Sequence, residues 1–374
     1  MTVRAALIDD SAVVRTHLTE LLQRGGIEVM LTAQDPVFAW SKLQARQAQG
    51  GGWPDVIVLD VEMPRMDGIT FLHQLMAERP TPVVMCSTLT EAGCATTMQA
   101  LAAGAVSFVT KPKLGLREFL EDRSNGLVEA VNAAARANVR AMGRATGTNT
   151  PRPSADASAP ALPAAPAPML AAMAETTDRV IAIGSSTGGV QTLESILLRM
   201  PRTTPGILIT QHMPERFTRA FAERLNKLVP MDVKEAETGD RLVNGRVLIA
   251  PGGRHLRLKR SGAHYLADVT DGPLVNRHKP SVDVLFRSVA QSAGANAIGV
   301  LLTGMGDDGA RGLLEMRKAG ARTAAQDEAS CVVFGMPMQA IKLGAAEDVV
   351  SLDGMPRWLV ERAAAPVRPA ARAV

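Results

Sequence analysis

The sequence predicts an α/β protein with two domains, each built on a parallel β-sheet. Apolar strands alternate with amphipathic helices along most of the chain, which is typical of such sheets. The chain has 374 residues, more than one core usually needs, and residues 143–177 consist largely of Ala, Pro, Ser and Thr. We therefore expect a first domain over 1–125, a helical extension and linker over 126–177, a second domain over 178–363, and a disordered Ala/Arg/Pro tail over 364–374.

The composition is that of a soluble globular protein, with 46% hydrophobic and 21% charged residues. The three cysteines (Cys86, Cys94 and Cys331) have no C-x-x-C spacing, which argues against disulfides or a zinc site and favours the reducing cytoplasm. Asp9 and Asp10 interrupt the first apolar run, so we expect no signal peptide. Because no stretch offers about 20 continuous apolar residues, we expect no membrane insertion.

The net charge of +4 is divided unevenly along the chain. Residues 1–125 carry 11 Lys+Arg and 14 Asp+Glu, a charge of −3, and the remainder carries 30 and 23, a charge of +7. A basic region is compatible with nucleic acid or with an acidic protein partner. Aromatic residues make up only 3% and no helix-turn-helix pattern is visible, so we predict no nucleic-acid partner.

Four predicted strands of the first domain end on polar residues. The strands cover 3–8, 56–59, 83–86 and 106–109, and a helix is predicted over 13–22. The polar residues that follow them are Asp9 and Asp10, Asp60, Ser87, and Lys111. Carboxyl ends of parallel strands meet at one edge, where three carboxylates can hold a hard divalent cation and a hydroxyl and an ammonium can contact phosphoryl oxygens. Each residue alone is more simply a strand-end cap, but together they favour a phosphoryl site.

Residues 3–125 resemble the response-regulator receiver domain. The stretches that carry the resemblance are Ile8-Asp9-Asp10-Ser11, Val58-Leu59-Asp60-Val61-Glu62-Met63-Pro64-Arg65-Met66-Asp67-Gly68, Cys86-Ser87-Thr88 and Phe108-Val109-Thr110-Lys111-Pro112. The resemblance implies a flavodoxin-like doubly wound parallel sheet. It also implies that Asp60 accepts the phosphoryl group and that Asp9, Asp10 and Asp60 bind Mg²⁺. Ser87 and Phe108 would be the switch residues, and Lys111 would contact the phosphoryl group.

The second domain begins with a strand over 180–183 that runs into Gly184-Ser185-Ser186-Thr187-Gly188. This is the G-x-S-x-G pattern of a strand-to-helix elbow, which holds a serine hydroxyl out on a tight turn. We expect Ser186 to be exposed there, and Ser185 to point elsewhere. Free N–H groups at the start of the following helix can stabilise an oxyanion. The alternative interpretation of the motif is a Gly/Ser-rich turn or phosphate loop.

Two further predicted strands end on residues suited to activate a serine. Residues 206–211 lead to His212, and 297–303 lead to the pair Asp307 and Asp308. A serine needs a base, and the base needs a third group that fixes its tautomer. The order Ser, His, Asp differs from the Ser, Asp, His order of α/β-hydrolases. The residues alone leave both aspartates open, and a structural role is the simpler interpretation of His212 by itself.

The other predicted elements of this domain surround these strands. Residues 246–250, 255–259 and 264–269 look like short strands of an appended antiparallel hairpin. Ser281 is expected to cap a helix. A helix over 215–228 and strands over 323–326 and 348–352 complete the pattern.

Residues 178–363 resemble the catalytic domain of the CheB-type protein-glutamate methylesterase/protein-glutamine glutaminase family of chemotaxis response regulators. The matching stretches are Ile183-Gly184-Ser185-Ser186-Thr187-Gly188-Gly189, Ile209-Thr210-Gln211-His212-Met213-Pro214, Ala250-Pro251-Gly252-Gly253, Pro280-Ser281-Val282-Asp283, Leu302-Thr303-Gly304-Met305-Gly306-Asp307-Asp308-Gly309 and Phe334-Gly335-Met336-Pro337. The resemblance implies a three-layer α/β esterase domain. Its implied site residues are the nucleophile Ser186, the base His212, the orienting acid Asp308, and an oxyanion or site loop with Thr187, Gly188 and Met305.

The resemblance also implies a function: a phosphorylation-activated serine hydrolase that removes glutamate methyl esters from methyl-accepting chemotaxis receptors and deamidates particular glutamines. A histidine kinase would phosphorylate Asp60 with Mg²⁺, and the ester reaction would need no cofactor. The unphosphorylated receiver would cover the esterase crevice. The alternatives are a non-catalytic binding module whose Gly/Ser turn holds phosphate or a nucleotide, and a receiver-regulated transcription factor.

Overall fold

The computed structural model describes residues 2–87, 90–111, 126–139 and 179–367. The predicted linker over 143–177 and residues 368–374 of the predicted tail lie outside the described residues. Within the part of the chain that is described, no helix has both the length and the apolar surface needed to span a bilayer.

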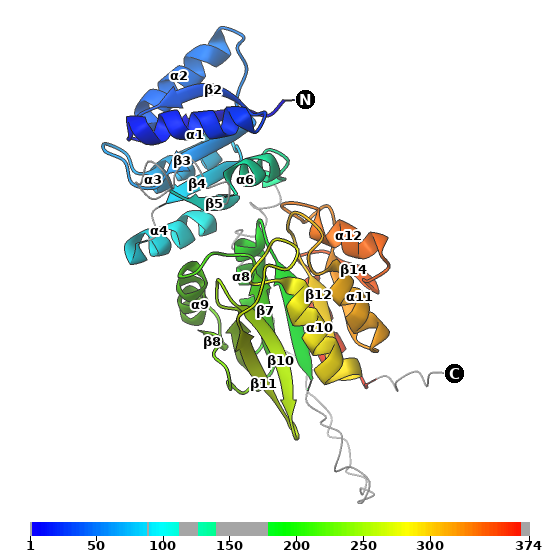
Figure 1. Cartoon of the computed structure of the whole chain (residues 1–374). Coiled ribbons are helices and arrows are strands. Elements are labelled where there is room, and N and C mark those ends of the chain that lie inside the picture. The colour runs from blue at the N-terminus through cyan, green and yellow to red at the C-terminus, as the bar shows by residue number, and fades with distance from the viewer. Residues whose placement is uncertain (1, 88–89, 112–125, 140–178, 368–374) are drawn as a thin grey trace, which may run out of the picture.

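The N-terminal domain is a five-stranded parallel sheet in the order β2-β1-β3-β4-β5 (Figure 1). Its strands are β1 (Arg4–Ile8), β2 (Glu28–Ala33), β3 (Val56–Asp60), β4 (Val83–Ser87) and β5 (Ser107–Thr110). Its helices are α1 (Ala12–Arg24), α2 (Pro36–Ala48), α3 (Gly68–Glu78), α4 (Glu91–Ala102) and α6 (Leu127–Ala134). This confirms the predicted doubly wound sheet. Helix α6 begins beyond residue 125 and packs against β4 and β5.

Short polar side chains begin the first three helices of this domain. Ser11, Asp35 and Asp67 each accept a hydrogen bond from a backbone N–H in the first turn of α1, α2 or α3. Such caps satisfy donors that the helix itself cannot pair, and so they fix where each strand-to-helix turn ends. Strand β2 was not predicted, because it is an edge strand whose partly exposed residues lack a continuous apolar run.

The C-terminal domain is a seven-stranded parallel sheet in the order β14-β13-β12-β6-β7-β9-β8. Its strands are β6 (Val180–Ser185), β7 (Gly206–Gln211), β8 (Asp232–Glu235), β9 (Arg246–Ile249), β12 (Ala297–Leu301), β13 (Arg322–Gln326) and β14 (Asp348–Val350). Its helices are α8 (Gly189–Leu197), α9 (Phe217–Leu228), α10 (Val282–Ala293), α11 (Ala310–Lys318), α12 (Met336–Lys342) and α13 (Met355–Ala364), with a short 3₁₀ turn at Gly294–Asn296.

Alternate residues of β6 pack into two different cores. Ile181 and Ile183 lie in the core with α8, α9 and α13, and Val180 and Ala182 lie in the core with α10 and α11. Helices therefore cover both faces of the sheet, which confirms the predicted three layers.

The prediction for 246–270 was partly wrong. Strands β10 (His255–Ser261) and β11 (His264–Thr270) form the expected antiparallel hairpin, but β9 pairs in parallel with β7 and β8 inside the main sheet. The physical reason is visible in the burial. Val247, Leu248 and Ile249 are all fully buried, as in a strand covered on both faces, whereas the hairpin strands alternate buried and exposed residues.

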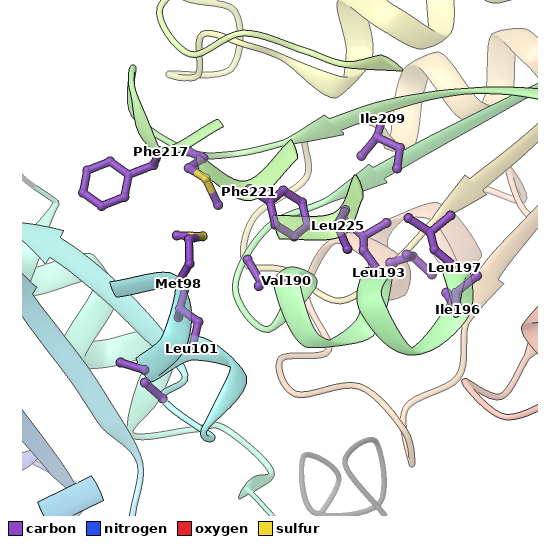
Figure 2. Packing of buried hydrophobic residues seen from close by; sticks show 14 of the residues in the cluster. Met98, Leu101, Val190, Leu193, Ile196, Leu197, Ile209, Phe217, Phe221 and Leu225 are labelled. Atoms are coloured by element: carbon purple, nitrogen blue, oxygen red, sulfur yellow. The ribbon is translucent and has the colours of Figure 1, made fainter. Parts of the chain in front are cut away.

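The two domains meet where α4 of the N-terminal domain packs against α8 and α9 of the second domain (Figure 1). Figure 2 shows Met98 and Leu101 of α4 facing Val190, Phe217 and Phe221, all of which belong to one buried cluster. At the edge of this contact, the rings of Phe108 and Phe217 lie 4.3 Å apart between centroids.

A buried polar contact accompanies this packing. The amide of Gln191, in the first turn of α8, donates to the carbonyl oxygen of Ala105 at 2.7 Å and to that of Leu101. Leu101 lies in the last turn of α4 and Ala105 in the loop after it, so a helix that begins beside Ser186 is tied to the N-terminal domain.

Candidate active site

The predicted elbow is present at the end of β6. Ser185 is the last residue of the strand and is fully buried, whereas Ser186 stands half-exposed in the turn. Gly188 has φ of +78° and precedes α8; a Cβ there would lie 2.4 Å from the Cβ of Val332. Both the backbone conformation and the close approach require glycine at this position. The turn thus presents Ser186, not Ser185, to the surface.

The pairing of β6 with β7 brings His212 beside this turn. The last paired residues of the two parallel strands are Ser185 and Gln211, so Ser186 and His212 are the next residue on each strand. The backbone N–H of His212 donates to the carbonyl of Ser185 at 3.1 Å. Neighbouring strands lie about 4.8 Å apart, so the two predicted reacting residues leave the sheet side by side.

Asp308 completes the arrangement from the loop after β12. One of its carboxylate oxygens, Oδ2, lies 2.8 Å from Nε2 of His212. The adjacent Asp307 is exposed, and its carboxylate is not part of this contact. The structure therefore distinguishes Asp308, which contacts His212, from Asp307, which does not. The sequence alone had left both aspartates open.

Asp308 also accepts hydrogen bonds from the start of α10. Donors to Oδ1 are the side chains of Asn276 and Ser281, both at 2.8 Å, and the backbone N–H of Val282 donates to Oδ2 at 2.7 Å. Ser281 occupies the predicted N-cap position, but its hydroxyl bonds Asp308 and not the helix backbone. The carboxylate of Asp308 itself thus caps α10, where the helix dipole favours negative charge.

These donors set the ionisation of Asp308. Burial alone would raise its pKa, but the hydrogen bonds from His212, Asn276 and the backbone of Val282 outweigh burial and hold the pKa well below its usual range. Asp308 is therefore an anion throughout the physiological pH range and accepts the Nε2 proton of His212.

The other ring nitrogen of His212 is buried and has no partner among the described residues. With Nε2 bonded to Asp308, the neutral imidazole carries its proton on Nε2 and its lone pair on Nδ1. Nδ1 is therefore the atom available to accept a proton. The described residues show no hydrogen bond between His212 and Ser186; such bonds are often long before substrate binds.

A second histidine, His278, stacks on His212, with ring centroids 3.7 Å apart and planes within 6° of parallel. Burial, and then the neighbouring His212, lower its pKa to about 4, so it is neutral at physiological pH. Ligand atoms of His212, His278 and Asp308 lie within 4.8 Å of one another, as in a metal site. Parallel stacked rings cannot aim both in-plane lone pairs at one ion, so this geometry does not fit a metal.

The predicted oxyanion loop lies around the elbow. The backbone N–H of Ser186 donates to the carbonyl of Thr303 at 3.0 Å, and that of Gly304 donates to Val333 at 3.0 Å. In contrast, the N–H groups of Thr187 and Met305 have no backbone acceptor among the described residues. Met305 is 39% exposed and Gly188 is buried.

The acidic residues at the strand ends of the N-terminal domain also meet. Carboxylate oxygens of Asp9, Asp10 and Asp60 lie within 4.8 Å of one another, and Nζ of Lys111 lies 2.6 Å from Asp60 and 3.0 Å from Asp9. Burial raises the pKa of Asp60 to about 6, against the opposing effect of Lys111. A set of carboxylate oxygens is the donor set that Mg²⁺ prefers, so the residues fit this ion.

The two predicted switch residues come from neighbouring strands, β4 and β5. Ser87, at the end of β4, is buried, and its hydroxyl donates to the carbonyl of Gly93 at 3.3 Å. Phe108 lies half-buried on β5 and contacts Phe217 of the other domain. Phe108, the second predicted switch residue, is therefore part of the domain contact.

Comparisons with known proteins identify both domains. The family model described as CheB methylesterase matches residues 181–359, and the response regulator receiver domain matches residues 5–121. The protein-glutamate methylesterase/protein-glutamine glutaminase 2 of Chromobacterium violaceum is 58% identical over 94% of this chain and 98% of its own length. The chain belongs to the CheB methylesterase family. The predicted family, and the predicted class of receiver-regulated methylesterase and glutaminase, are confirmed.

A second relative agrees with this assignment. The protein of the same name from Xanthomonas campestris pv. campestris is 58% identical over 95% of this chain and 99% of its own length. The crystal structure of the Thermotoga maritima CheB methylesterase catalytic domain is 37% identical, covers 49% of this chain and 98% of that chain, and has a TM-score of 0.48.

The sequence offered no reason to assign a role at this site to three side chains that lie there: Gln211, Asn276 and the stacked His278. Asn276 and Arg277 both have positive φ, at 50° and 67°, in a two-residue turn between Val275 and His278. An Asn that tolerates this backbone was the available signal for the turn. Nothing local indicated that the turn would reach Asp308 and His212.

Proposed function

We propose that this chain hydrolyses γ-methyl esters of glutamates in methyl-accepting chemotaxis receptors and deamidates particular receptor glutamines, with Ser186 as nucleophile, His212 as base and Asp308 as orienting acid. The observation that carries the proposal is the bond of Asp308 to Nε2 of His212, which leaves Nδ1 unpartnered next to the serine turn. The names of the relatives support the substrate class.

The proposed reaction has two stages, formation of an acyl-enzyme and its hydrolysis. The hydroxyl oxygen of Ser186 attacks the glutamyl carbonyl carbon while Nδ1 of His212 takes the hydroxyl proton. The resulting oxyanion accepts hydrogen bonds from backbone N–H groups, for which Thr187 and Met305 are the candidates. Collapse breaks the bond to the methoxy group, or to the amide nitrogen, which leaves as methanol or ammonia with the proton from His212. Water then hydrolyses the acyl-enzyme by the same proton transfers in reverse, which regenerates Ser186 and releases glutamate.

The receiver would control access to this site. We propose that the chain acts in the cytoplasm, where a chemotaxis histidine kinase phosphorylates Asp60. Asp9, Asp10 and Asp60 would hold Mg²⁺, which would neutralise phosphoryl charge. Lys111 already contacts both Asp9 and Asp60 and can follow the new phosphoryl group. Because α4 and Phe108 pack against the helices that follow Ser186 and His212, a change in the receiver face weakens this contact and opens the crevice.

The test of the proposed activity is Ser186→Ala against Ser185→Ala, assayed by methanol release from methylated receptor. We expect Ser186→Ala to abolish release and labelling by a serine-directed phosphonate, because removal of a triad member typically costs several orders of magnitude in kcat. Ser185→Ala should retain both, because its hydroxyl is buried. Inactivation by Ser185→Ala alone would place the nucleophile one residue earlier. No release by the wild type would refute the proposed function.

A further inference from the structure

The amide of Gln211 joins the two predicted reacting residues through their backbones. Gln211 ends β7 and is 4% exposed. Its Nε2 donates to the carbonyl oxygen of Ser186 at 2.9 Å and to that of His212 at 3.1 Å, and its Oε1 accepts from the hydroxyl of Ser185 at 2.6 Å. Every polar atom of the side chain is thus used within the serine turn and the start of the histidine loop.

The hydrogen-bonding groups around this amide determine which end carries the nitrogen and which the oxygen. The reverse orientation would place Oε1 against two carbonyl oxygens, which are acceptors only, so Nε2 must face them. The fit is also tight, because a Cβ on Gly189 would lie 2.1 Å from Oε1 of Gln211. Glycine at 189 therefore leaves the space that the amide fills.

The hydrogen bond from Gln211 to the Ser186 carbonyl also orients the N–H of Thr187, which belongs to the same peptide group. In a planar trans peptide, the carbonyl of one residue and the N–H of the next point in opposite directions. Gln211 and the N–H of Gly189 (2.8 Å) both hold the Ser186 carbonyl, so the N–H of Thr187 points away from them. That N–H has no backbone acceptor among the described residues and is a candidate oxyanion donor. Hydrogen bonding to the carbonyl also polarises the peptide and strengthens its N–H as a donor.

We propose that Gln211 is a positioning residue of the esterase site, which aims the Thr187 N–H at the developing oxyanion and fixes the backbone of His212 relative to that of Ser186. This inference rests on the proposed function, because it assigns Gln211 a part in that reaction. Gln211 acts through the backbone and does not itself touch substrate.

The test compares Gln211→Met, Gln211→Glu and Ser185→Ala in the full chain. Gln211→Met keeps the length of the side chain but removes both donors, so we expect kcat to fall about 10²-fold, the usual cost of a lost oxyanion donor, with KM within about threefold. Gln211→Glu places carboxylate oxygens against the two carbonyls and should lose at least as much. Ser185→Ala removes only the bond to Oε1 and leaves both N–H donors, so kcat should stay within about threefold.

Two further measurements separate positioning from a general structural defect. The acid limb of kcat/KM should be unchanged in Gln211→Met, because the base His212 keeps its bond to Asp308, and circular dichroism should show a folded protein at the assay temperature. A wild-type kcat in Gln211→Met, a loss confined to KM, or an equal loss in Ser185→Ala would each overturn the inference. If one variant does not fold, the other decides. An inactive wild type would instead refute the proposed function.

Discussion

Asp60 and Asp308 are two buried aspartates with opposite electrostatics. Each lies at the carboxyl edge of a parallel sheet, and they are 2% and 1% exposed. Burial pushes both pKa values upward, yet the pKa of Asp60 rises to about 6, whereas that of Asp308 falls well below its usual range. Burial therefore does not explain the difference between the receiver site and the esterase site.

The difference lies in the donors around each carboxylate. Asp308 accepts hydrogen bonds from His212, Asn276, Ser281 and the N-terminus of α10. Among the described residues, Asp60 has the cation of Lys111 close by, a backbone N–H from Glu62 at 3.4 Å, and the carboxylate of Asp9 nearby. A carboxylate with all its lone pairs occupied can only orient a neighbour, whereas one with a weakly bonded oxygen can act as ligand or nucleophile.

The largest expected effect comes from a change at Asp308, the aspartate of the esterase site. Asp308→Asn should lower kcat by about 10³–10⁴, because the amide no longer fixes the tautomer of His212. Asp307→Asn is the matched control, since Asp307 is adjacent but exposed, and it should have little effect. Methanol release measures both. Equal losses would mean that the pair acts jointly, and Asp308 would lose its assigned role.

An intermediate effect is expected on the receiver side. Residues 178–374 alone should be about tenfold more active than the unphosphorylated full chain, because the contact of α4 with α8 and α9 is absent. Asp60→Asn should keep basal activity but lose its response to a small-molecule phosphodonor with Mg²⁺.

A third variant tests the same contact within the full chain. Gln191→Met removes the bonds to Leu101 and Ala105 without a change in side-chain length and should raise basal turnover. Methanol-release rates of the full chain, the fragment and both variants test the contact. Equal rates for the full chain and the fragment would exclude occlusion and leave the receiver a role in targeting.

The smallest expected effect concerns a histidine, His278, instead of an aspartate. His278 has a pKa of about 4 in the folded protein, below its ordinary 6.5, because burial disfavours its charged form. The unfolded chain therefore binds more protons between these values, and stability should fall as pH drops from about 6.5 to about 4. His278→Phe keeps a stacked ring without a titrating nitrogen, so denaturant unfolding at pH 7.5 and pH 5 should differ less than in the wild type. An identical pH dependence would contradict the assignment; His17, whose pKa is also lowered, is the same in both proteins.

The sequence by itself determined the fold class and the residues at the strand ends. Continuous apolar runs such as Val180–Ile183 and the polar residues after each strand are local signals, and parallel topology brings strand ends to one edge. The same logic failed for β2 and β8, edge strands with little apolar character, and for β9, whose short apolar run does not reveal its partners.

Only the tertiary structure decided how the site is held together. Asp307 and Asp308 are equivalent in sequence, but the loop after β12 buries one and exposes the other. Asn276, His278 and Gln211 reach the site through contacts between segments far apart in the chain, and hydrogen bonds of side chains leave no periodic pattern in a sequence. The pKa of a buried carboxylate depends on these donors, so the direction of its shift can be inferred only from the folded structure.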